Sequence, residues 1–580
     1  MRIPCRPEPY NLAALQGSLK ANTLQFTRLG FCFEALSGIS PIMTDTFAFA
    51  TWTEARDAAH TARKSGDVAQ AIAILRGLAV AFPTKEGIAA AARGLRACGQ
   101  WNDAVALLED AVVFQPVSTA LTVALADAYV EKKYFSNAIA CVQVYLDRIP
   151  HDAALWVNLG GLHFAAAEWT EAERAFSHAL TLKPLDLDAA LGQGDALYRL
   201  GRNDEAIAAY RRVLALKPDD ARAHFKLGSV LAAGPDLGEA KAALRNAIAL
   251  DPSNAAAYVN FAGVLHQLGR LAEAAEAARQ AVNLDGGLVA AYSILGTIFL
   301  ESGQFQPAAE ILRIAADLDP GAVMILTALA TAENAIDNPR AAERLLQRIL
   351  AIEPANLEAR HMLSAVNGEP VRSVPPGYSR QLFNWYAEKF DRMLADSLNY
   401  RAPQDVAAML MDVKPEPRAF SALLDLGCGT GLVAEALAKH YVIDHKVGVD
   451  VAEKMVEVSR KKGFYDEVIH GDAADVLAAR ASAFDLITAV DMFIYVGDLA
   501  PLMPLMARAL KSGGVLAYSI EVMTEGKYKL QRTGRFAHTI KYVEDLAKSH
   551  GLTPLASRAV TLRLENTAGV PGLIGLLQRA

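Results

Sequence analysis

A buried strand, a glycine turn and the start of a helix follow one another in Leu423-Leu424-Asp425-Leu426-Gly427-Cys428-Gly429-Thr430-Gly431. The apolar run ends at Gly427, and residues 432–440 predict a helix whose N-terminus faces the turn. Glycines let the backbone pass close to a ligand. The spacing GxGxG is one residue shorter than the GxGxxG of dinucleotide folds, so the segment predicts either a nucleoside site or a tight structural turn.

Acidic residues end the next two predicted strands. Residues 446–450 form a short apolar run that ends in Asp450, whose carboxylate can accept both hydroxyls of a ribose. Residues 467–472 end in Asp472, which can receive an adenine amino group. Taken singly, each acid is also explained as a helix N-cap or an exposed loop residue. Because both acids follow strands at the distance of a βαβαβ unit, the pair favours a nucleoside site.

In this order, the glycine turn, the ribose acid and the adenine acid resemble the class I S-adenosylmethionine-dependent methyltransferases. The resemblance implies a seven-stranded sheet with an antiparallel final strand, and S-adenosylmethionine as the cofactor. It also implies a cofactor site made of Asp425, Gly427, Cys428, Gly429, Gly431, Asp450, Val451, Asp472 and Ala473. A small side chain is usual in the family at the position of Cys428, which indicates packing and not a nucleophile.

Strands and helices continue to alternate toward the C-terminus. The predicted elements are strands over 484–491 and 513–521 with a helix over 498–511 between them, a helix over 540–550, and final strands near 555–563 and 570–579. This alternation predicts a doubly wound, Rossmann-like α/β domain. Such a domain has helices on both faces of a mainly parallel sheet and binds its ligand at the carboxyl ends of the strands.

The first half of the chain repeats with a period of 34 residues. The period is marked by Pro116, Pro150, Pro184, Pro218, Pro252, Pro320 and Pro354, with Gly286 at the one missing mark. A proline ends one helix and starts the next turn, and small residues within the unit let two helices approach closely. The period therefore predicts an all-α array of helix pairs.

Each unit also resembles the tetratricopeptide repeat. In the unit that begins near Ala153, the matching residues are Trp156, Leu159, Gly160, His163, Ala172, Phe176, Ala179 and Pro184. We expect about nine repeats over 52–356, a capping helix over 357–366 and a linker over 367–377. The resemblance implies a superhelical solenoid over 52–366, which recruits a protein or peptide partner in its groove, and a methyltransferase domain over 378–580.

Composition predicts a soluble protein of two parts. The 580 residues exceed one ordinary core, and the 52% hydrophobic residues come largely from alanine-rich helices. No uninterrupted apolar run reaches the ~18 residues of a membrane span. The net charge of -7 and the pI near 6.0 argue against a broad nucleic-acid-binding surface. Five widely spaced cysteines indicate neither a disulfide framework nor a metal site, and a cytoplasmic location is expected.

Residues 1–50 follow neither pattern. They are basic, and their apolar part is too interrupted for a secretory signal. Because the helical pattern of the first repeat begins soon after Met43, we expect that Met43 is the true start of translation. Peptides from residues 1–42 in mass spectrometry of the natively expressed protein would contradict this expectation.

Candidate catalytic residues lie at the end of the predicted fourth strand. Asp491 ends the strand, and Tyr495 lies in the segment that follows, close to the methyl group that the resemblance implies. Asp491 is a candidate base, a candidate ligand for the charged amino-acid end of the cofactor, or a strand-terminal cap. A sulfonium methyl group is already activated, so a base is needed only for a nucleophile that carries a proton.

Residues 379–391 precede the core and contain a Tyr-Ala-x-x-Phe-Asp motif. The motif resembles the helix that covers the pocket in a bacterial group of methyltransferases carrying tetratricopeptide repeats. The resemblance implies that Tyr386 contacts the substrate. Ordinary amphipathic packing is the alternative.

Residues 532–538 resemble the same bacterial group, in which relatives have Thr-Gly-Arg-Tyr-Ala-His; here Phe536 replaces the tyrosine. Arg535 is a candidate for holding an anionic substrate, and His538 for accepting a proton. The alternatives are a solvated loop arginine and a helix-capping histidine.

Methyl transfer from S-adenosylmethionine to an unidentified acceptor is the leading hypothesis. Nucleic acid is a disfavoured substrate, because the sequence motifs of DNA amine and cytosine methylases do not follow the predicted fourth strand. A binding scaffold with a vestigial catalytic domain is the second hypothesis, and the intact glycines and both acids argue against it. A tetratricopeptide-fused glycosyltransferase is disfavoured, because the C-terminal part has the length of one doubly wound domain, about 200 residues.

Overall fold

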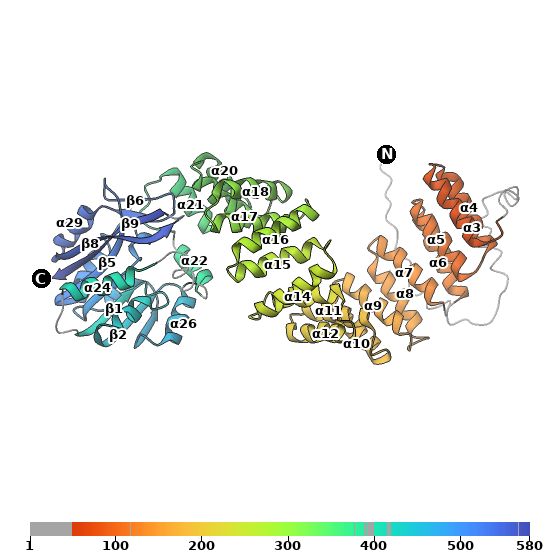
Figure 1. Cartoon of the computed structure of the whole chain (residues 1–580), viewed down its shortest axis with the longest axis horizontal. Helices are drawn as coiled ribbons and strands as arrows, with labels where there is room; N and C mark the ends of the chain where they lie inside the picture. The colour runs from red at the N-terminus through yellow and green to blue at the C-terminus, as the bar shows by residue number, and fades with distance from the viewer. Residues whose placement is uncertain are drawn as a thin grey trace. The chain divides into compact units, whose positions relative to one another are not determined.

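The chain forms two compact units, Met1–Val230 and Leu231–Ala580. The computed structural model describes residues 49–115, 118–375, 377–387, 390, 400–413, 419–565 and 568–580. Figure 1 colours these residues from red at the N-terminus to blue at the C-terminus. The predicted extension before residue 49, with Met43, lies outside the described residues, as does Pro116.

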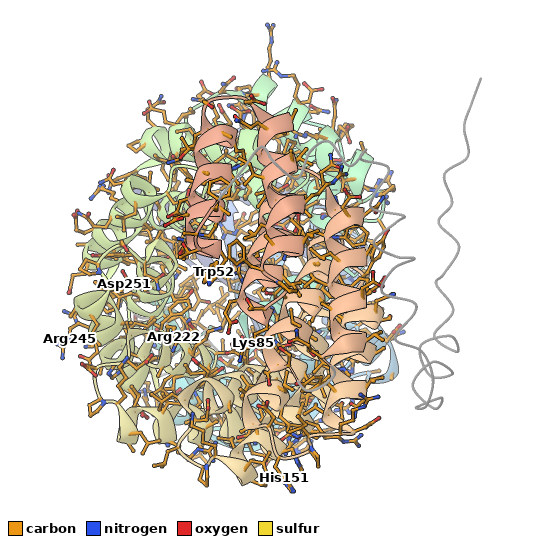
Figure 2. The ribbon with its side chains drawn as sticks, turned by 90° about the vertical axis from the view of Figure 1, so that its right-hand side faces the viewer. Trp52, Lys85, His151, Arg222, Arg245 and Asp251 are labelled. Atoms are coloured by element: carbon orange, nitrogen blue, oxygen red, sulfur yellow. The ribbon has the colours of Figure 1, made fainter. Side chains whose placement is uncertain are left out.

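The first unit consists of helices that follow one another in pairs. They are α3 Trp52–Lys64, α4 Val68–Ala81, α5 Lys85–Ala97, α6 Trp101–Phe114, α7 Thr119–Glu131, α8 Phe135–Leu146, α9 Ala153–Ala165, α10 Trp169–Leu182, α11 Leu187–Arg199, α12 Asn203–Leu216 and α13 Ala221–Leu231. Figure 2 labels Trp52 and Lys85, the first residues of α3 and α5.

The ends of these helices recur with the repeat period. Asp152, Asp186 and Asp220 accept hydrogen bonds from backbone N–H groups in the first turns of α9, α11 and α13. Such caps satisfy donors that a helix leaves unpaired at its start. Pro184 and Pro218 lie just beyond α10 and α12, where a proline prevents the helix from continuing. A proline and a capping aspartate thus mark the starts of α11 and α13.

Small residues let paired helices approach closely, and an ion pair joins adjacent repeats. A Cβ at Gly194 of α11 would lie 2.5 Å from the ring of Tyr210 on α12, so the two helices meet at a distance that excludes a larger residue. Arg222 donates to Asp188 at 3.1 Å, which joins equivalent positions of adjacent repeats (Figure 2 labels Arg222). The small residues that recur in the sequence therefore lie where paired helices contact each other.

Replacing Gly194 by alanine is expected to lower the free energy of unfolding of the repeat array by about 1–3 kcal/mol, because the added methyl overlaps Tyr210. Gly161 on α9 provides the matched control, since nothing lies within 4 Å of a Cβ built there. Gly161→Ala should stabilise the array by up to about 1 kcal/mol through helix propensity. Thermal denaturation of both variants measures the two effects, and shifts of the same sign would contradict the prediction.

The second unit begins with α14, followed by three helix pairs and a final single helix. They are α14 Leu237–Leu250, α15 Ala255–Gln267, α16 Leu271–Leu284, α17 Val289–Glu301, α18 Phe305–Leu318, α19 Val323–Ala335, α20 Pro339–Ile352 and α21 Leu357–Asn367. The single helix α21 ends at Gly368, whose φ of +66° is the left-handed conformation common after a helix. It occupies the segment in which we predicted a capping helix.

An α/β domain forms the rest of the second unit, coloured from green-cyan to blue in Figure 1. Its strands are β1 Ala419–Leu426, β2 Val442–Asp450, β3 Glu467–His470, β4 Phe484–Ala489, β5 Leu510–Val522, β6 Tyr528–Leu530, β7 Phe536–His538, β8 Leu552–Glu565 and β9 Ala568–Arg579. Its helices are α22 Tyr378–Tyr386, α24 Ala402–Val413, α25 Leu432–Ala438, α26 Glu453–Lys462, α27 Ala473–Ala479, the 3-10 helix η2 Phe493–Tyr495, α28 Met503–Ala509 and α29 Ile540–Ser549.

The strand order is that of a doubly wound sheet. β3, β2, β1, β4 and β5 are neighbours in this order and run parallel. β9 runs antiparallel to β5 and pairs with β8, which confirms the antiparallel final strand. Met503 and Val543 of α28 and α29 pack in one buried cluster, and Leu410 and Leu437 of α24 and α25 pack in another. The prediction of a helical repeat array followed by a Rossmann-like α/β domain is confirmed.

Two details of the predicted domain were wrong. The helix predicted over 498–511 is shorter, because Pro504 favours a helix start there and β5 begins already at Leu510. Residues 528–538 contain a hairpin of two short strands that we did not predict: β6 pairs with β7, and β7 pairs with the end of β5. Among the described residues, no helix has the length and apolar character needed to cross a membrane.

Candidate functional site

The glycine turn between β1 and α25 folds over the end of β2. The N–H groups of Gly427 and Cys428 both donate to the carbonyl of Val449, at 2.9 and 3.0 Å. Gly427, Gly429 and Gly431 have φ values of +67°, +53° and +94°, a region that residues with a Cβ rarely adopt. The turn therefore requires glycines for its backbone conformation as well as for space.

Side chains from three other segments surround the turn. A Cβ at Gly427 would lie 3.3 Å from Met492, and one at Gly431 would lie 3.3 Å from Tyr465. At Gly429 the nearest side chain is Phe390, at 3.8 Å. We call the backbone of these three glycines, at the N-terminus of α25, the cradle. Side chains added at these positions would fill the space beside it. The cradle fits a ligand that needs close backbone contact, as a nucleoside cofactor does.

Asp450 lies at the end of β2, in direct contact with the turn. Its Oδ2 accepts a hydrogen bond from the N–H of Gly429 at 2.9 Å, and its Oδ1 accepts one from the N–H of Ala452 at 2.8 Å. Burial raises the pKa of Asp450, and these backbone donors lower it. Each carboxylate oxygen can accept a second hydrogen bond, so the side chain can still receive two hydroxyl groups.

Asp472 lies one strand further along the same edge of the sheet. Asp450 pairs with His470 at the end of β3, and this register brings Asp472 to the edge that carries the turn. Asp472 caps α27 by accepting from the N–H of Ala474 at 2.8 Å, which is the alternative role named above. Capping and cofactor binding are compatible, because a carboxylate can accept several hydrogen bonds. The neighbouring Val451 and Ala473 are half-buried at this edge.

Asp425 lies beneath the turn rather than in the cradle. It is 1% exposed, and its two oxygens accept hydrogen bonds from the hydroxyls of Tyr465 at 2.5 Å and Thr488 at 2.6 Å. Burial raises the pKa of Asp425 to about 6. Cys428 is also buried, and burial raises the pKa of its thiol well above the usual value. These contacts favour a structural role for Asp425 and packing for Cys428.

The raised pKa of Asp425 predicts a pH-dependent stability. Between pH 4 and pH 6 the folded state holds a proton that the unfolded state has released, so the free energy of unfolding falls as the pH rises. A shift from the ordinary carboxyl value of 3.8 to about 6 corresponds to a loss on the order of 3 kcal/mol. Asp425→Asn should lack this loss. Denaturation of both proteins from pH 4 to pH 7 measures it, and parallel pH profiles would contradict the prediction.

Asp491 follows β4 in a strained conformation. Its φ is +54°, which is rare for a residue other than glycine. Its N–H donates to Ser519 Oγ at 2.8 Å, and Ser519 Oγ donates to its Oδ1 at 3.1 Å. Tyr400 forms a further hydrogen bond with the carboxylate. Burial raises the pKa of Asp491, while Arg563 and Ser519 lower it. Backbone strain at a firmly held carboxylate is common at functional sites.

A buried ion pair between Arg563 and Glu521 lies next to Asp491. Arg563 of β8 is 3% exposed and forms a salt bridge with Glu521 of β5, which is 7% exposed. Arg563 Nη1 lies 3.8 Å from Asp491 Oδ2. The guanidinium thus lies between two carboxylates and favours the charged form of Asp491.

Tyr495 and the two predicted substrate residues, Tyr386 and Arg535, influence one another electrostatically. Tyr495 and Arg535 share a side-chain hydrogen bond. Burial raises the pKa of Tyr386, with Glu358 and Tyr495 acting in the same direction and Arg535 opposing them. The ring centroid of Phe383 lies 5.2 Å from that of Tyr495. The structure therefore joins Tyr495 and Arg535, which the sequence predicted only separately, and places Tyr386 within electrostatic range of both.

Helix α22 packs against α26, and Phe390, which follows α22 in the chain, faces the turn. Asn384 Oδ1 accepts a hydrogen bond from the N–H of Lys454 at 3.0 Å, which ties α22 to the start of α26. Ala387 and Met455 share a buried cluster with Phe390, the residue that faces Gly429. The final residue of the predicted motif, Asp391, lies outside the described residues.

His538 lies inside the domain, on β7. It is fully buried, and its Nε2 donates to the carbonyls of Val496 and Gly497, at 3.0 and 2.9 Å. Burial lowers the pKa of His538, while the hydrogen bonds to the carbonyls of Gly497 and Val496 raise it. This geometry favours a structural role over the proton-accepting role that we considered. His538 instead joins the hairpin to the loop that carries Tyr495.

Several residues of the site were not predicted. They are Tyr400, Tyr465, Thr488, Ser519 and Arg563. Arg563 gave the one usable signal, since an arginine in a buried strand needs a carboxylate partner. Thr488 and Ser519 stand in apolar strands and are indistinguishable in sequence from ordinary strand residues.

Comparison with known proteins agrees with this geometry. A methyltransferase domain model matches residues 424–518, which span the glycine turn and both acids. Tetratricopeptide repeat models match residues 194–234 and 230–295. The recognition of the two parts from sequence is therefore confirmed.

Curated relatives match the C-terminal part. The chain is 35% identical over 100 residues to the ubiquinone biosynthesis O-methyltransferase of Coxiella burnetii, a match that covers 17% of this chain and 42% of that protein. It is 28% identical over 171 residues to the enzyme of the same name from Xylella fastidiosa, with 27% and 68% covered. The chain thus spans less than half the length of the Coxiella relative. A solved structure of the MamA protein matches with 23% identity and a TM-score of 0.27, over 29% of this chain and 92% of that one.

Proposed function

We propose that this chain, a methyltransferase domain preceded by tetratricopeptide repeats, transfers a methyl group from S-adenosylmethionine to an acceptor that its repeat array recruits. The cradle of Gly427, Gly429 and Gly431, closed by Asp450, is the observation that carries the proposal. The array is proposed to hold a protein or peptide in its groove. A cytoplasmic location stays a prediction.

The residues present fit the cofactor. The glycine turn and the first turn of α25 would lie against it, Asp450 would accept from its ribose, and Asp472 would accept from its adenine. When bound, S-adenosylmethionine supplies a methyl group that is already activated as a sulfonium. What the chain adds is positioning and exclusion of water, and positioning alone is worth roughly 7–11 kcal/mol of the barrier.

The side chains around Asp491 would handle the acceptor. Burial raises the pKa of Asp491 and the nearby Arg563 opposes that rise, and Tyr495 and Arg535 are joined to each other by a side-chain hydrogen bond. Helix α22, through Phe383 and Tyr386, excludes water from this place. The two relatives are named O-methyltransferases, and a hydroxyl acceptor fits a site in which a carboxylate can take up its proton.

Transfer of a labelled methyl group tests the proposal. The purified chain is incubated with methyl-labelled S-adenosylmethionine and a cell lysate, and the labelled species is identified. Asp450→Ala should abolish labelling, whereas Asp444→Ala, an exposed position on the same strand β2, should not. Binding of S-adenosylmethionine by the wild-type chain without any labelled product would instead support the scaffold with a vestigial domain.

A further inference from the structure

The turn that carries Arg535 is held by the repeat array. This turn connects β6 to β7 and closes on itself, because the N–H of Gln531 donates to the carbonyl of Arg535 at 2.7 Å. Asn334 of α19 donates to the carbonyl of Arg532 at 2.9 Å. His361 of α21 donates from Nε2 to the carbonyl of Gly534 at 2.7 Å. Two helices of the array therefore bind the backbone on either side of the turn.

The contact at His361 is buried and closely packed. His361 is 1% exposed, and its ring centroid lies 4.6 Å from that of Tyr378, the first residue of α22. A Cβ at Gly534 would lie 2.9 Å from Met362 Sδ, so α21 and the turn are in close contact, and the φ of +77° at Gly534 favours glycine there. An ion pair between Arg532 and Asp337 adds a further link at the exposed rim.

An apolar cluster extends the same contact. Ala365 of α21 is buried with Leu530 of β6 and Phe536 of β7, and Val371 and Val374 of the linker pack against them. The array, the linker and the hairpin therefore share one small core. The two strands of the hairpin contribute side chains to this core that an isolated α/β domain would leave uncovered.

The other side of the hairpin contacts the loop after β4, which carries Tyr495. His538 of β7 donates to the carbonyls of Val496 and Gly497, and Arg535 hydrogen-bonds to Tyr495. The N–H of Asp498 also donates to the carbonyl of Arg372 in the linker, at 2.8 Å. A continuous set of buried contacts thus runs from α21 through the hairpin to the loop after β4.

We propose that His361, a residue of the repeat array, is a positioning residue for the methyltransferase site, and that it acts by fixing the turn that places Arg535 against Tyr495. This inference rests on the proposed function for its effect on methyl transfer. The physical link itself does not depend on that function. His361 is not a catalytic residue, because it reaches the site only through the backbone of Gly534.

The inference has a direct consequence for the array. A partner that binds the array and shifts α21 would move Arg535 as well, because the turn is bonded to α21 and α19 rather than to the sheet alone. The array would then set the geometry of the site in addition to recruiting the acceptor. Coupling between two binding sites typically changes an equilibrium affinity about 5-fold to 150-fold.

Three variants of the full chain test the inference. His361→Phe keeps a ring against Tyr378 and removes the donor, whereas His361→Gln keeps an N–H donor near the position of Nε2. His163→Phe, which changes a histidine of α9 that pairs with Glu168, controls for a change of this type elsewhere in the array. Hydrogen exchange is measured in peptides covering 528–538 and 493–498, together with binding of S-adenosylmethionine and labelling of the lysate acceptor.

In His361→Phe we expect exchange to accelerate about tenfold in both peptides, as the loss of one buried hydrogen bond predicts. Labelling should fall about tenfold with cofactor affinity unchanged, and His361→Gln should restore both. Unchanged exchange in 493–498, or unchanged labelling despite faster exchange, would overturn the inference. If the wild-type chain neither binds S-adenosylmethionine nor labels an acceptor, the proposed function fails, and the exchange data still decide whether His361 fixes the site.

Discussion

Replacing Gly429 by valine is expected to raise the dissociation constant for S-adenosylmethionine by at least about 100-fold, or about 2.7 kcal/mol. Gly429 has a φ of +53°, which a β-branched residue adopts only with strain. The new side chain would point toward Phe390 and fill the cradle. It would also displace the N–H that Asp450 accepts, so the turn and the acid would be disturbed together. Isothermal titration calorimetry measures the change.

Gly463→Val is the matched control for this experiment. Gly463 follows α26 with a φ of +71°, and nothing lies within 4 Å of a Cβ built there. The control therefore introduces similar backbone strain away from the cradle. We expect it to lower the melting temperature without weakening cofactor binding. Equal affinities in the two variants would show that the glycine turn is not the cofactor site.

Arg563→Met is expected to destabilise the α/β domain by about 3–5 kcal/mol, because it leaves the carboxylate of Glu521 buried without its cation. The same change removes the positive charge of Arg563, which lies 3.8 Å from the Asp491 carboxylate. The pKa of Asp491 should therefore rise further. Differential scanning calorimetry measures the stability. Methyl transfer, once an acceptor is known, should show its acid limb displaced to higher pH.

Arg558→Met gives the comparison on the same strand. Arg558 pairs with Asp412 at 2.6 Å, and both side chains are largely exposed, so its loss should cost at most about 1 kcal/mol. The double variant Arg563→Met with Glu521→Leu should recover much of the lost stability, since no buried charge remains. A cost for Arg563→Met no larger than that for Arg558→Met would contradict the importance of burial.

The elements that lie close together in sequence were predictable. The glycine turn, Asp450 and Asp472 each follow a short apolar strand, and the topology of a parallel sheet brings such strand ends to one edge. Gly194 and Tyr210 could be read from the repeat period, because each unit buries the same positions. In both cases the local pattern and the global fold impose the same requirement.

Contacts between distant segments were not predictable in this way. Tyr465 and Thr488 bind Asp425 from two different segments, and a single sequence contains no signal that joins a tyrosine to an aspartate 40 residues away. The assignment of Asp425 to the cofactor site therefore came from resemblance alone. The hairpin of β6 and β7 was missed because its strands are only three residues long, too short for a pattern of alternating side chains.

The shared core of Ala365, Leu530 and Phe536 determines where the chain can be cut. A truncated protein that starts at Tyr378 would contain every strand of the sheet. It would nevertheless expose the side chains of Leu530 and Phe536 and remove the contacts that hold the turn beside Arg535. Such a fragment should aggregate, and whatever remained in solution would have a loosened site. A fragment that contains the α/β domain and stays in solution should therefore begin no later than α19. It then includes α19, α20 and α21 as part of its fold.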